Sequence, residues 1–378
     1  MKRIEKNGIE ELLKALHRLG YRTIGPTLRD EVIVYDEIAS MRDLPAGWTD
    51  VVGPGSYEIH RRDDGALFGF TPGPHSWKSY LFPPRIRLFS ALRTGHGFSI
   101  EHDASENGQE EPKLAFIGAR ACELAAIGIH DRVFTGGEYV DPAYERVREH
   151  LFIVAVNCLH PGRNCFCASM NAGPAATSGF DLALTEIVDG EEHFFLVEVG
   201  TARGEGVLRD VPHRDAEPLE AAIAEAAVKA ASGRVEKSMN TEQIKELLYE
   251  NFDHAEWDNV AKRCLTCANC TMVCPTCFCS TVEDVTDLTG GHAERWRRWD
   301  SCFTVDFARV AGGNFRSSAK SRYRQWMTHK LASWIDQFGT SGCVGCGRCI
   351  TWCPVGIDIT EEVNTIRSTS VAKEVEHV

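Results

Sequence analysis

The sequence lacks any apolar run long enough to cross a membrane. A transmembrane helix needs about 20 consecutive apolar residues, whereas the best short run extends only from Leu151 to Val156. The chain begins Met1-Lys2-Arg3-Ile4-Glu5-Lys6 and leads into an amphipathic pattern, not the uninterrupted apolar core of a signal peptide. These absences predict no membrane association, and a cytoplasmic location is the default expectation.

Nucleotide-binding fingerprints are also missing. No GxGxxG motif follows a predicted strand and no Walker loop is present, and the glycine pair Gly290-Gly291 lacks the required spacing. The chain therefore shows no nicotinamide or flavin site of its own. Its 14 histidines are scattered without a convincing HxxxH pair, so we expect them mostly at surface or core positions.

Positive charge is scarce overall, with 41 Lys+Arg against 54 Asp+Glu and a net charge of −13. Such an acidic chain is a poor general binder of nucleic acid. The stretch from His292 to Lys330 is the exception, because it has a local net charge of +6 and interleaved Trp and Tyr residues. This stretch could imitate a nucleic-acid patch. We favour a different interpretation, in which these cations offset the charge of negatively charged clusters or dock an acidic partner.

Cysteine is absent from the first 121 residues and unevenly distributed after them. Of 15 cysteines, four lie between Cys122 and Cys167, the next 96 positions have none, and eleven lie between Cys264 and Cys353. An odd count in a chain expected in a reducing compartment argues against a disulfide framework and favours metal ligation. The change in cysteine density predicts a domain boundary near residues 235–245.

The residue patterns predict an α+β chain. Strand-like runs and helical spacing alternate in the first region, where residues 114–156 have the pattern of a βαβ unit. Alternation on both sides of Asp189-Gly190 predicts a hairpin. Later residues show helical stretches and few strand signals. We therefore expect an N-terminal mixed α/β domain over 1–235 and a mainly helical domain over 245–378.

Two cysteine runs in the second region share one spacing. Each reads C-x2-C-x2-C-x3-C-P, from Cys264 to Pro275 and from Cys343 to Pro354, which is the bacterial ferredoxin pattern. In that pattern three thiolates of one run bind a [4Fe–4S] cube, and the fourth binds the other cube. The predicted ligand sets are therefore Cys264, Cys267, Cys270 and Cys353 for cluster 1, and Cys343, Cys346, Cys349 and Cys274 for cluster 2.

Structural zinc is the alternative for these runs. Zinc sites usually show CxxC pairs with His partners, so two complete copies with both prolines favour iron–sulfur clusters. The long insertion between the copies favours a helical ferredoxin-type dicluster domain over the short ferredoxin fold. Two cubes in one domain imply the transfer of single electrons.

Four earlier cysteines predict a third [4Fe–4S] cluster. Cys122 begins a predicted helix after a strand, Cys158 follows another strand, and Cys165 and Cys167 form a CxC pair in a loop. Strand ends and a turn can bring four thiolates to one cavity, although ordinary buried thiols are the alternative. Three thiols remain, and we favour inert shielding of the cubes over a further site or a reactive pair; they are Cys277, Cys279 and Cys302.

A family resemblance rests on several segments together with both ferredoxin runs. These segments are Ser76-Trp77-Lys78, Leu81-Phe82-Pro83-Pro84, Gly118 to Glu123, Val154 to Cys158, Cys165 to Met170 and Gly179 to Glu186. In these segments the chain resembles the β (iron–sulfur) subunit of cytosolic sulfhydrogenases, the NADP-linked [NiFe] hydrogenases. It is also similar to the A subunit of anaerobic sulfite reductase. The resemblance covers nearly the whole chain.

The resemblance implies an electron-transfer subunit of a multi-subunit oxidoreductase, with catalysis on a partner and no catalytic residue here. The implied partners are a flavin/NAD(P)H-binding subunit and [NiFe] hydrogenase subunits, or a sirohaem subunit in the sulfite reductase alternative. Neither nucleic acid nor membrane is expected as a partner. A self-contained enzyme that reduces a sulfur compound and a binding module that uses metal only for folding are the remaining hypotheses.

Overall fold

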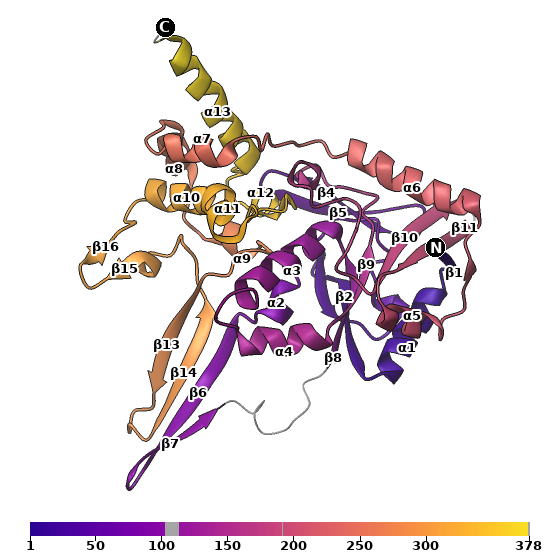
Figure 1. The fold of residues 1–378 in the computed structure, drawn as a ribbon, viewed down its shortest axis with the longest axis horizontal. Coiled ribbons are helices and arrows are strands. Elements are labelled where there is room, and N and C mark those ends of the chain that lie inside the picture. The colour runs from indigo at the N-terminus through magenta and orange to yellow at the C-terminus, as the bar shows by residue number, and fades with distance from the viewer. Residues whose placement is uncertain (103–112, 191, 377–378) are drawn as a thin grey trace.

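The computed structural model describes residues 1–102, 113–190 and 192–376 (Figure 1). Its largest sheet has eight strands in the order β12-β1-β11-β10-β9-β8-β2-β3. The central strands β2, β8, β9 and β10 run parallel, and the outer pairs are antiparallel. The strands are β1 (Lys2–Glu5), β2 (Tyr21–Arg29), β3 (Val32–Glu37), β8 (Lys113–Ala119), β9 (Phe152–Val156), β10 (Leu182–Asp189), β11 (Glu192–Val199) and β12 (Arg214–Asp215).

Residues 113–156 form the predicted βαβ unit. Strands β8 and β9 pair in parallel, and α3 (Ala121–Phe134) and α4 (Pro142–His150) connect them. Helix α4 begins after Asp141, whose carboxylate accepts hydrogen bonds from the N–H groups of Ala143 and Tyr144, and proline occupies the first turn. Helix α3 follows β8 directly, so its first turn lies at the carboxyl edge of the parallel strands. The predicted hairpin around Gly190 is present as β10 and β11.

Apolar cores lie on both faces of the large sheet. Within β8, Ala115 and Ile117 belong to one core and Leu114 and Phe116 to the other, as the alternation of a strand requires. The helices on these two faces are α1 (Gly8–Arg18) and α5 (Ala202–Leu208) for the first, and α2 (Lys78–Leu81), α3 and α4 for the second. The rest of this region comprises η1 (Met41–Asp43), β4 (Trp48–Gly53), β5 (Ser56–Arg61) and α6 (Pro218–Gly233).

The region after residue 244 contains both helices and strands, so the expectation of a mainly helical domain stays a prediction. No helix among the described residues is long and apolar enough to span a membrane. The helices are α7 (Ile244–Glu250), α8 (Glu256–Arg263), α9 (Asn269–Met272), η4 (Asp306–Ala308), α10 (Ala319–Thr328), the π-helical η5 (His329–Ser333), α11 (Trp334–Phe338), α12 (Arg348–Thr351) and α13 (Ile359–Glu376). The strands are β13 (Ser280–Thr286), β14 (His292–Trp299), β15 (Arg309–Val310) and β16 (Gly313–Asn314).

The hairpin of β13 and β14 was not predicted from the sequence. Strand β14 pairs with β6 (Arg85–Thr94), which pairs with β7 (Gly97–His102), and the four strands project from the body as an arm (Figure 1). Few side chains of this arm are buried, so the apolar alternation that reveals a strand is weak. The division into regions 1–235 and 245–378 stays a prediction, since strands from both regions share this sheet.

Through Glu362, helix α13 contacts α8, which ends at Arg263 directly before the first cysteine run. Arg263 donates to the Glu362 carboxylate at 2.6 Å, and Glu256 on α8 also contacts it. Burial raises the pKa of Glu362 to about 7, from an ordinary value of 4.5. The folded state therefore binds this proton more tightly than the unfolded chain. The contribution of protonated Glu362 to the free energy of unfolding is complete below about pH 4.5 and is lost as the pH rises through about 7.

We therefore expect the thermal unfolding midpoint to fall between pH 5 and pH 8 more steeply in the wild type than in the Glu362→Gln variant. The amide of the variant cannot titrate, so the substitution removes the pH-dependent contribution of Glu362 to stability and leaves the contributions of other groups in place. Anaerobic differential scanning calorimetry across this range measures both slopes. Equal slopes in the wild type and the variant would contradict a raised pKa at Glu362.

Candidate metal centres

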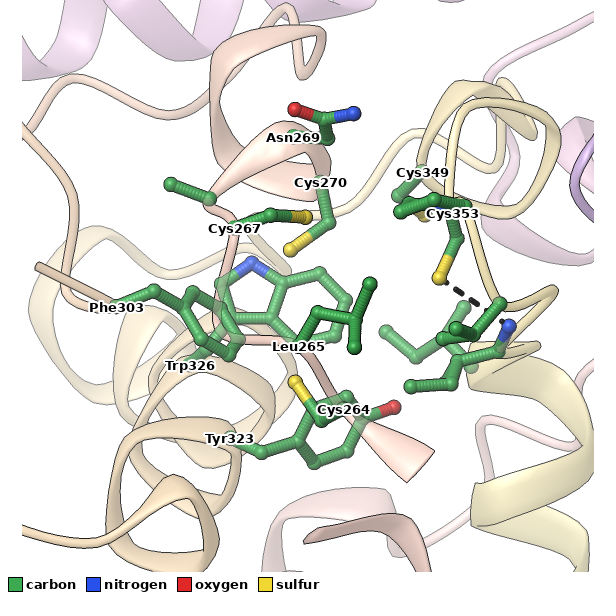
Figure 2. Close-up of a pocket in the computed structure, with 15 residues that line it drawn as sticks. Cys264, Leu265, Cys267, Asn269, Cys270, Phe303, Tyr323, Trp326, Cys349 and Cys353 are labelled. Carbon is green, nitrogen blue, oxygen red and sulfur yellow. Dashed lines mark hydrogen bonds between the residues drawn. The ribbon is translucent and has the colours of Figure 1, made fainter. Parts of the chain in front are cut away.

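The four cysteines predicted to bind cluster 1 line one apolar pocket. Three come from the first cysteine run and Cys353 comes from the second, so the pocket joins segments far apart in the sequence. Figure 2 shows the four side chains around one space, together with the rings of Phe303, Tyr323 and Trp326. The backbone N–H of Ile357 donates to the Sγ atom of Cys353 at 3.3 Å. The crossed arrangement of the ferredoxin pattern is therefore assembled at this end of the domain.

Two buried donors in the cluster 1 pocket fit an iron–sulfur cube. The hydroxyl of Tyr323 and the Nε1–H of Trp326 have no hydrogen-bond partner among the described residues. An unpaired buried donor costs about 1–3 kcal/mol, so an acceptor is expected, and the inorganic sulfides of a cube are acceptors. Within the described ranges, no three His, Cys, Asp or Glu side chains are close enough to share one ion. A cube binds each thiolate through a different iron.

The two cysteine runs adopt the same local conformation. Thr266 and Ala268 in the first run have φ angles of 52° and 67°, and Gly345 and Gly347 at the corresponding positions have φ angles of 65° and 75°. Each run then forms a single helical turn, α9 or α12. In each run, the N–H two residues after the first cysteine donates to its Sγ atom, at 3.4 Å and 3.5 Å. Such hydrogen bonds to sulfur help to set the reduction potential of a cluster.

The four cysteines predicted to bind cluster 2 also lie together. The pKa of Cys349 is raised by burial and then by the charges of Cys343, Cys346 and Cys274. Cys274 comes from the first run, so this set is crossed as well. Buried Lys330 donates to the Sγ atom of Cys274 at 3.3 Å, and to the hydroxyl of Thr276 and the carbonyl of Gly342, both at 3.0 Å.

The Lys330 contact predicts a change in one potential. Reduction adds negative charge to a cluster, so the Lys330→Met variant should have a cluster 2 that is harder to reduce. A unit charge about 5 Å away at an effective dielectric constant near 20 contributes about 3 kcal/mol, so the potential should fall by on the order of 100 mV. Redox titration followed by electron paramagnetic resonance measures the shift. The control is Lys320→Met, a lysine that pairs with Asp258 at the surface. Equal potentials in the two variants would contradict this role.

The four middle cysteines meet at the carboxyl edge of β8 and β9. Cys122 lies in the first turn of α3, Cys158 follows β9, and η3 (Cys167–Met170) begins at the CxC pair. Burial raises the pKa of all four thiols. The pKa of Cys165 is raised further by Cys158 and Cys167, and that of Cys122 by Cys346 and then Cys167. The structure therefore brings together the four residues predicted to bind a third cluster.

The second cysteine run packs directly against the CxC loop. The N–H of Phe166 donates to the carbonyl of Gly345 at 2.8 Å, and the thiol of Cys165 donates to the carbonyl of Cys346 at 3.8 Å. A Cβ atom at Gly345 would lie 2.6 Å from the backbone of Phe166, and one at Gly347 would lie 2.5 Å from the carbonyl of Asn164. Glycine at both positions permits this close approach. The middle cysteines thus lie beside the cluster 2 set.

A buried ion pair connects the same two sets. The guanidinium of Arg348 donates to the Glu123 carboxylate at 2.6 Å, and both side chains are 1% exposed. Glu123 also accepts the N–H of Arg120 and the hydroxyl of Tyr35. The Nη1 atom of Arg348 is buried and has no partner in the described part of the chain. The Arg348 charge opposes the burial that raises the pKa of Cys346, which fits a site for anionic thiolates.

The basic stretch between His292 and Lys330 is largely neutralised within the protein. Strand β14 presents three of its cations, and each has a carboxylate partner: Arg295 with Asp284, Arg297 with Asp141, and Arg298 with Glu283. Lys330 contacts a predicted cluster ligand, as the interpretation of offset charge requires.

The three remaining thiols lie near one another. Cys277 interacts electrostatically with Cys274 and with Cys302. Cys279 and Cys302 line one pocket, and the interaction with Cys302 lowers the pKa of Cys279 to about 7. The expectation of inert shielding stays a prediction, and a reactive pair was the alternative that the sequence left open. A hint was available, because the two thiols flank the segment that forms the hairpin.

Comparisons with known proteins agree with this geometry. Residues 263–357 match the model of the 4Fe-4S dicluster domain. Over 365 residues the chain is 30% identical to the sulfhydrogenase 2 subunit beta of Pyrococcus furiosus, an alignment that covers 94% of this chain and 95% of that protein. No solved structure is found to match the chain. The dicluster domain implies [4Fe–4S] clusters and electron transfer. The chain belongs to the family of sulfhydrogenase beta subunits, which confirms the resemblance predicted from its sequence.

Proposed function

We propose that this chain is the electron-transfer iron–sulfur subunit of a multi-subunit, cytoplasmic, sulfhydrogenase-type [NiFe] hydrogenase. It relays single electrons between a flavin/NAD(P)H subunit and the catalytic subunit, so catalysis takes place on a partner. The name of the Pyrococcus furiosus relative, a subunit beta, supports assembly with other chains. The observation that carries the proposal is the crossed assembly of two four-cysteine sets, one of them around a pocket with unpaired buried donors.

The ligands follow from these sets. Cluster 1 is bound by Cys264, Cys267, Cys270 and Cys353, cluster 2 by Cys343, Cys346, Cys349 and Cys274, and a third [4Fe–4S] cluster by Cys122, Cys158, Cys165 and Cys167. The convergence of the four middle thiols beside Cys346 supports the third cluster.

The sets lie in a row that suits a relay. Cys165 contacts the backbone of Cys346, and Cys349 of the cluster 2 set lines the cluster 1 pocket. The order is therefore third cluster, cluster 2, cluster 1. Cys267 is exposed, so cluster 1 reaches the surface, where a partner can exchange electrons with it. The protein supplies fixed ligands, hydrogen bonds to sulfur and a buried lysine, while the clusters accept and release the electrons.

Anaerobic purification of the complex from its host tests the proposal. We expect about 12 iron atoms and about 12 inorganic sulfides per chain for three cubes, and paramagnetic signals that appear on addition of NADPH when the flavin subunit is present. Zinc in place of iron and sulfide would overturn the relay. A co-purified subunit with nickel supports the hydrogenase assignment, whereas one with sirohaem selects a sulfite reductase. Sulfur reduction by the isolated chain with an artificial donor would select a self-contained reductase.

A further inference from the structure

Cys279 and Cys302 are held face to face by the hairpin of β13 and β14. Cys279 immediately precedes β13 and Cys302 follows β14, where Ser280 lies opposite Trp299 in the ladder. The N–H of Asp300 donates to the carbonyl of Cys279 at 2.8 Å, which extends the pairing by one step. Cys302 follows Asp300 by two residues and lines the same pocket as Cys279. The hairpin therefore brings the two cysteines close together.

The pair also lies at a pocket. Both cysteines line it, with Arg316, His329 and the aromatic side chains of Phe278, Phe307 and Phe338. Cys279 is partly exposed, whereas Cys302 is only 8% exposed. This is the arrangement of an attacking thiol with a resolving thiol behind it. Arg316 forms no ion pair with the described residues, so its charge is available to an anionic ligand.

A third thiol connects the pair to the cluster 2 ligands. Cys277 lies between Cys274 and Cys279 in the sequence and interacts electrostatically with Cys274 and with Cys302. Lys330, which donates to Cys274, also acts on Cys279 through its charge. A short path of sulfur atoms thus leads from a predicted cluster ligand to the pocket.

We propose that Cys279 and Cys302 form a redox-active dithiol/disulfide pair that reduces a small anionic disulfide bound in this pocket. The proposal rests on the proposed function, because the clusters supply its electrons. The Cys279 thiolate attacks one sulfur of the substrate disulfide RSSR, forms a mixed disulfide and releases one thiol RSH after protonation. Cys302 then attacks the Cys279 sulfur, releases the second RSH and leaves a Cys279–Cys302 disulfide. Two electrons from the clusters and two protons restore the dithiol, so RSSR + 2 e⁻ + 2 H⁺ gives 2 RSH.

The test uses the anaerobic complex with oxidised glutathione as the anionic disulfide. After exposure to glutathione, alkylation and peptide mapping should find the Cys279–Cys302 disulfide. A reductive titration of that sample should consume two more electrons per chain than the Cys279→Ser variant does, because that variant has no attacking thiol, whereas Cys302→Ser should retain a mixed disulfide at Cys279. Glutathione reduction driven by the complex's own electron donor should fall at least about tenfold in the Cys279→Ser and Cys302→Ser variants. Thr281→Ala, one step further along β13, is the matched control.

The role of Arg316 separates binding from chemistry. Arg316→Gln should raise the KM for oxidised glutathione several-fold and leave the KM for the neutral bis(2-hydroxyethyl) disulfide unchanged. Equal effects on both substrates would overturn the anionic preference.

Three other results would overturn the proposal, and they differ from one another. Free thiols after glutathione treatment, with normal iron content and cluster signals, would reject the pair and leave the relay intact. A loss of about four irons per chain in both cysteine variants would show that the two thiols bind another cluster. A wild-type complex without clusters would reject the proposed function and this reaction with it.

Discussion

Replacing Cys353 with alanine should abolish cluster 1, which is otherwise held by the first cysteine run, and spare cluster 2. The Cys353 side chain lines the pocket of Cys264, Cys267 and Cys270, although it belongs to the second run. Alanine offers no ligand, so the cube loses one of four thiolates. Iron content should fall by about four atoms per chain, and one set of paramagnetic signals should disappear.

The crossed pairing makes a sharper comparison possible. The spectrum of Cys353→Ala should match that of Cys264→Ala, and the spectrum of Cys274→Ala should match that of Cys343→Ala. If Cys353→Ala instead matches Cys343→Ala, each run binds its own cube and the crossed assignment is wrong. All four variants are compared in the same complex, prepared anaerobically.

Breaking the buried ion pair should cause the largest loss of stability. In the Arg348→Met variant the Glu123 carboxylate would stay 1% exposed without its cation. Removing one partner of a buried pair typically costs about 3–5 kcal/mol. The double variant Arg348→Met/Glu123→Gln should recover part of this loss, because no uncompensated charge remains. Anaerobic urea unfolding of the variants measures the differences in the free energy of unfolding.

A surface pair provides the matched control. Arg298 and Glu283 are 50% and 36% exposed, and solvent screens their charges. Arg298→Met should therefore cost less than about 1 kcal/mol. A loss of stability in Arg348→Met no larger than this would show that the buried pair does not hold the two regions together.

The convergence of the cysteine sets could be predicted from the sequence because cluster chemistry imposes short, regular spacings. The runs beginning at Cys264 and Cys343 each specify a loop, and the ferredoxin pattern itself specifies the exchange of Cys274 and Cys353. The βαβ unit was predictable for a similar reason, since β8 and β9 are short apolar runs on either side of a helical segment.

The contacts between distant segments could not be predicted. Arg348 and Glu123 are 225 positions apart, and each looks like an ordinary surface charge in its local sequence. Strand β14 is rich in arginine, so its pairing with β6 is settled by long-range contacts and not by apolar alternation. The proximity of Cys279 and Cys302 depends on the same hairpin, so it could not be predicted from the sequence either.

The position of Cys353 in the pocket of the first run has a consequence for biogenesis. A ribosome makes Cys264, Cys267 and Cys270 well before it reaches Cys353, so the nascent chain lacks one of the four proposed ligands of cluster 1. Cys274 is likewise made before Cys343, Cys346 and Cys349, the other proposed ligands of cluster 2. With these ligand sets, complete iron loading follows translation of nearly the entire polypeptide, and a chain truncated before residue 353 would lack one ligand of cluster 1.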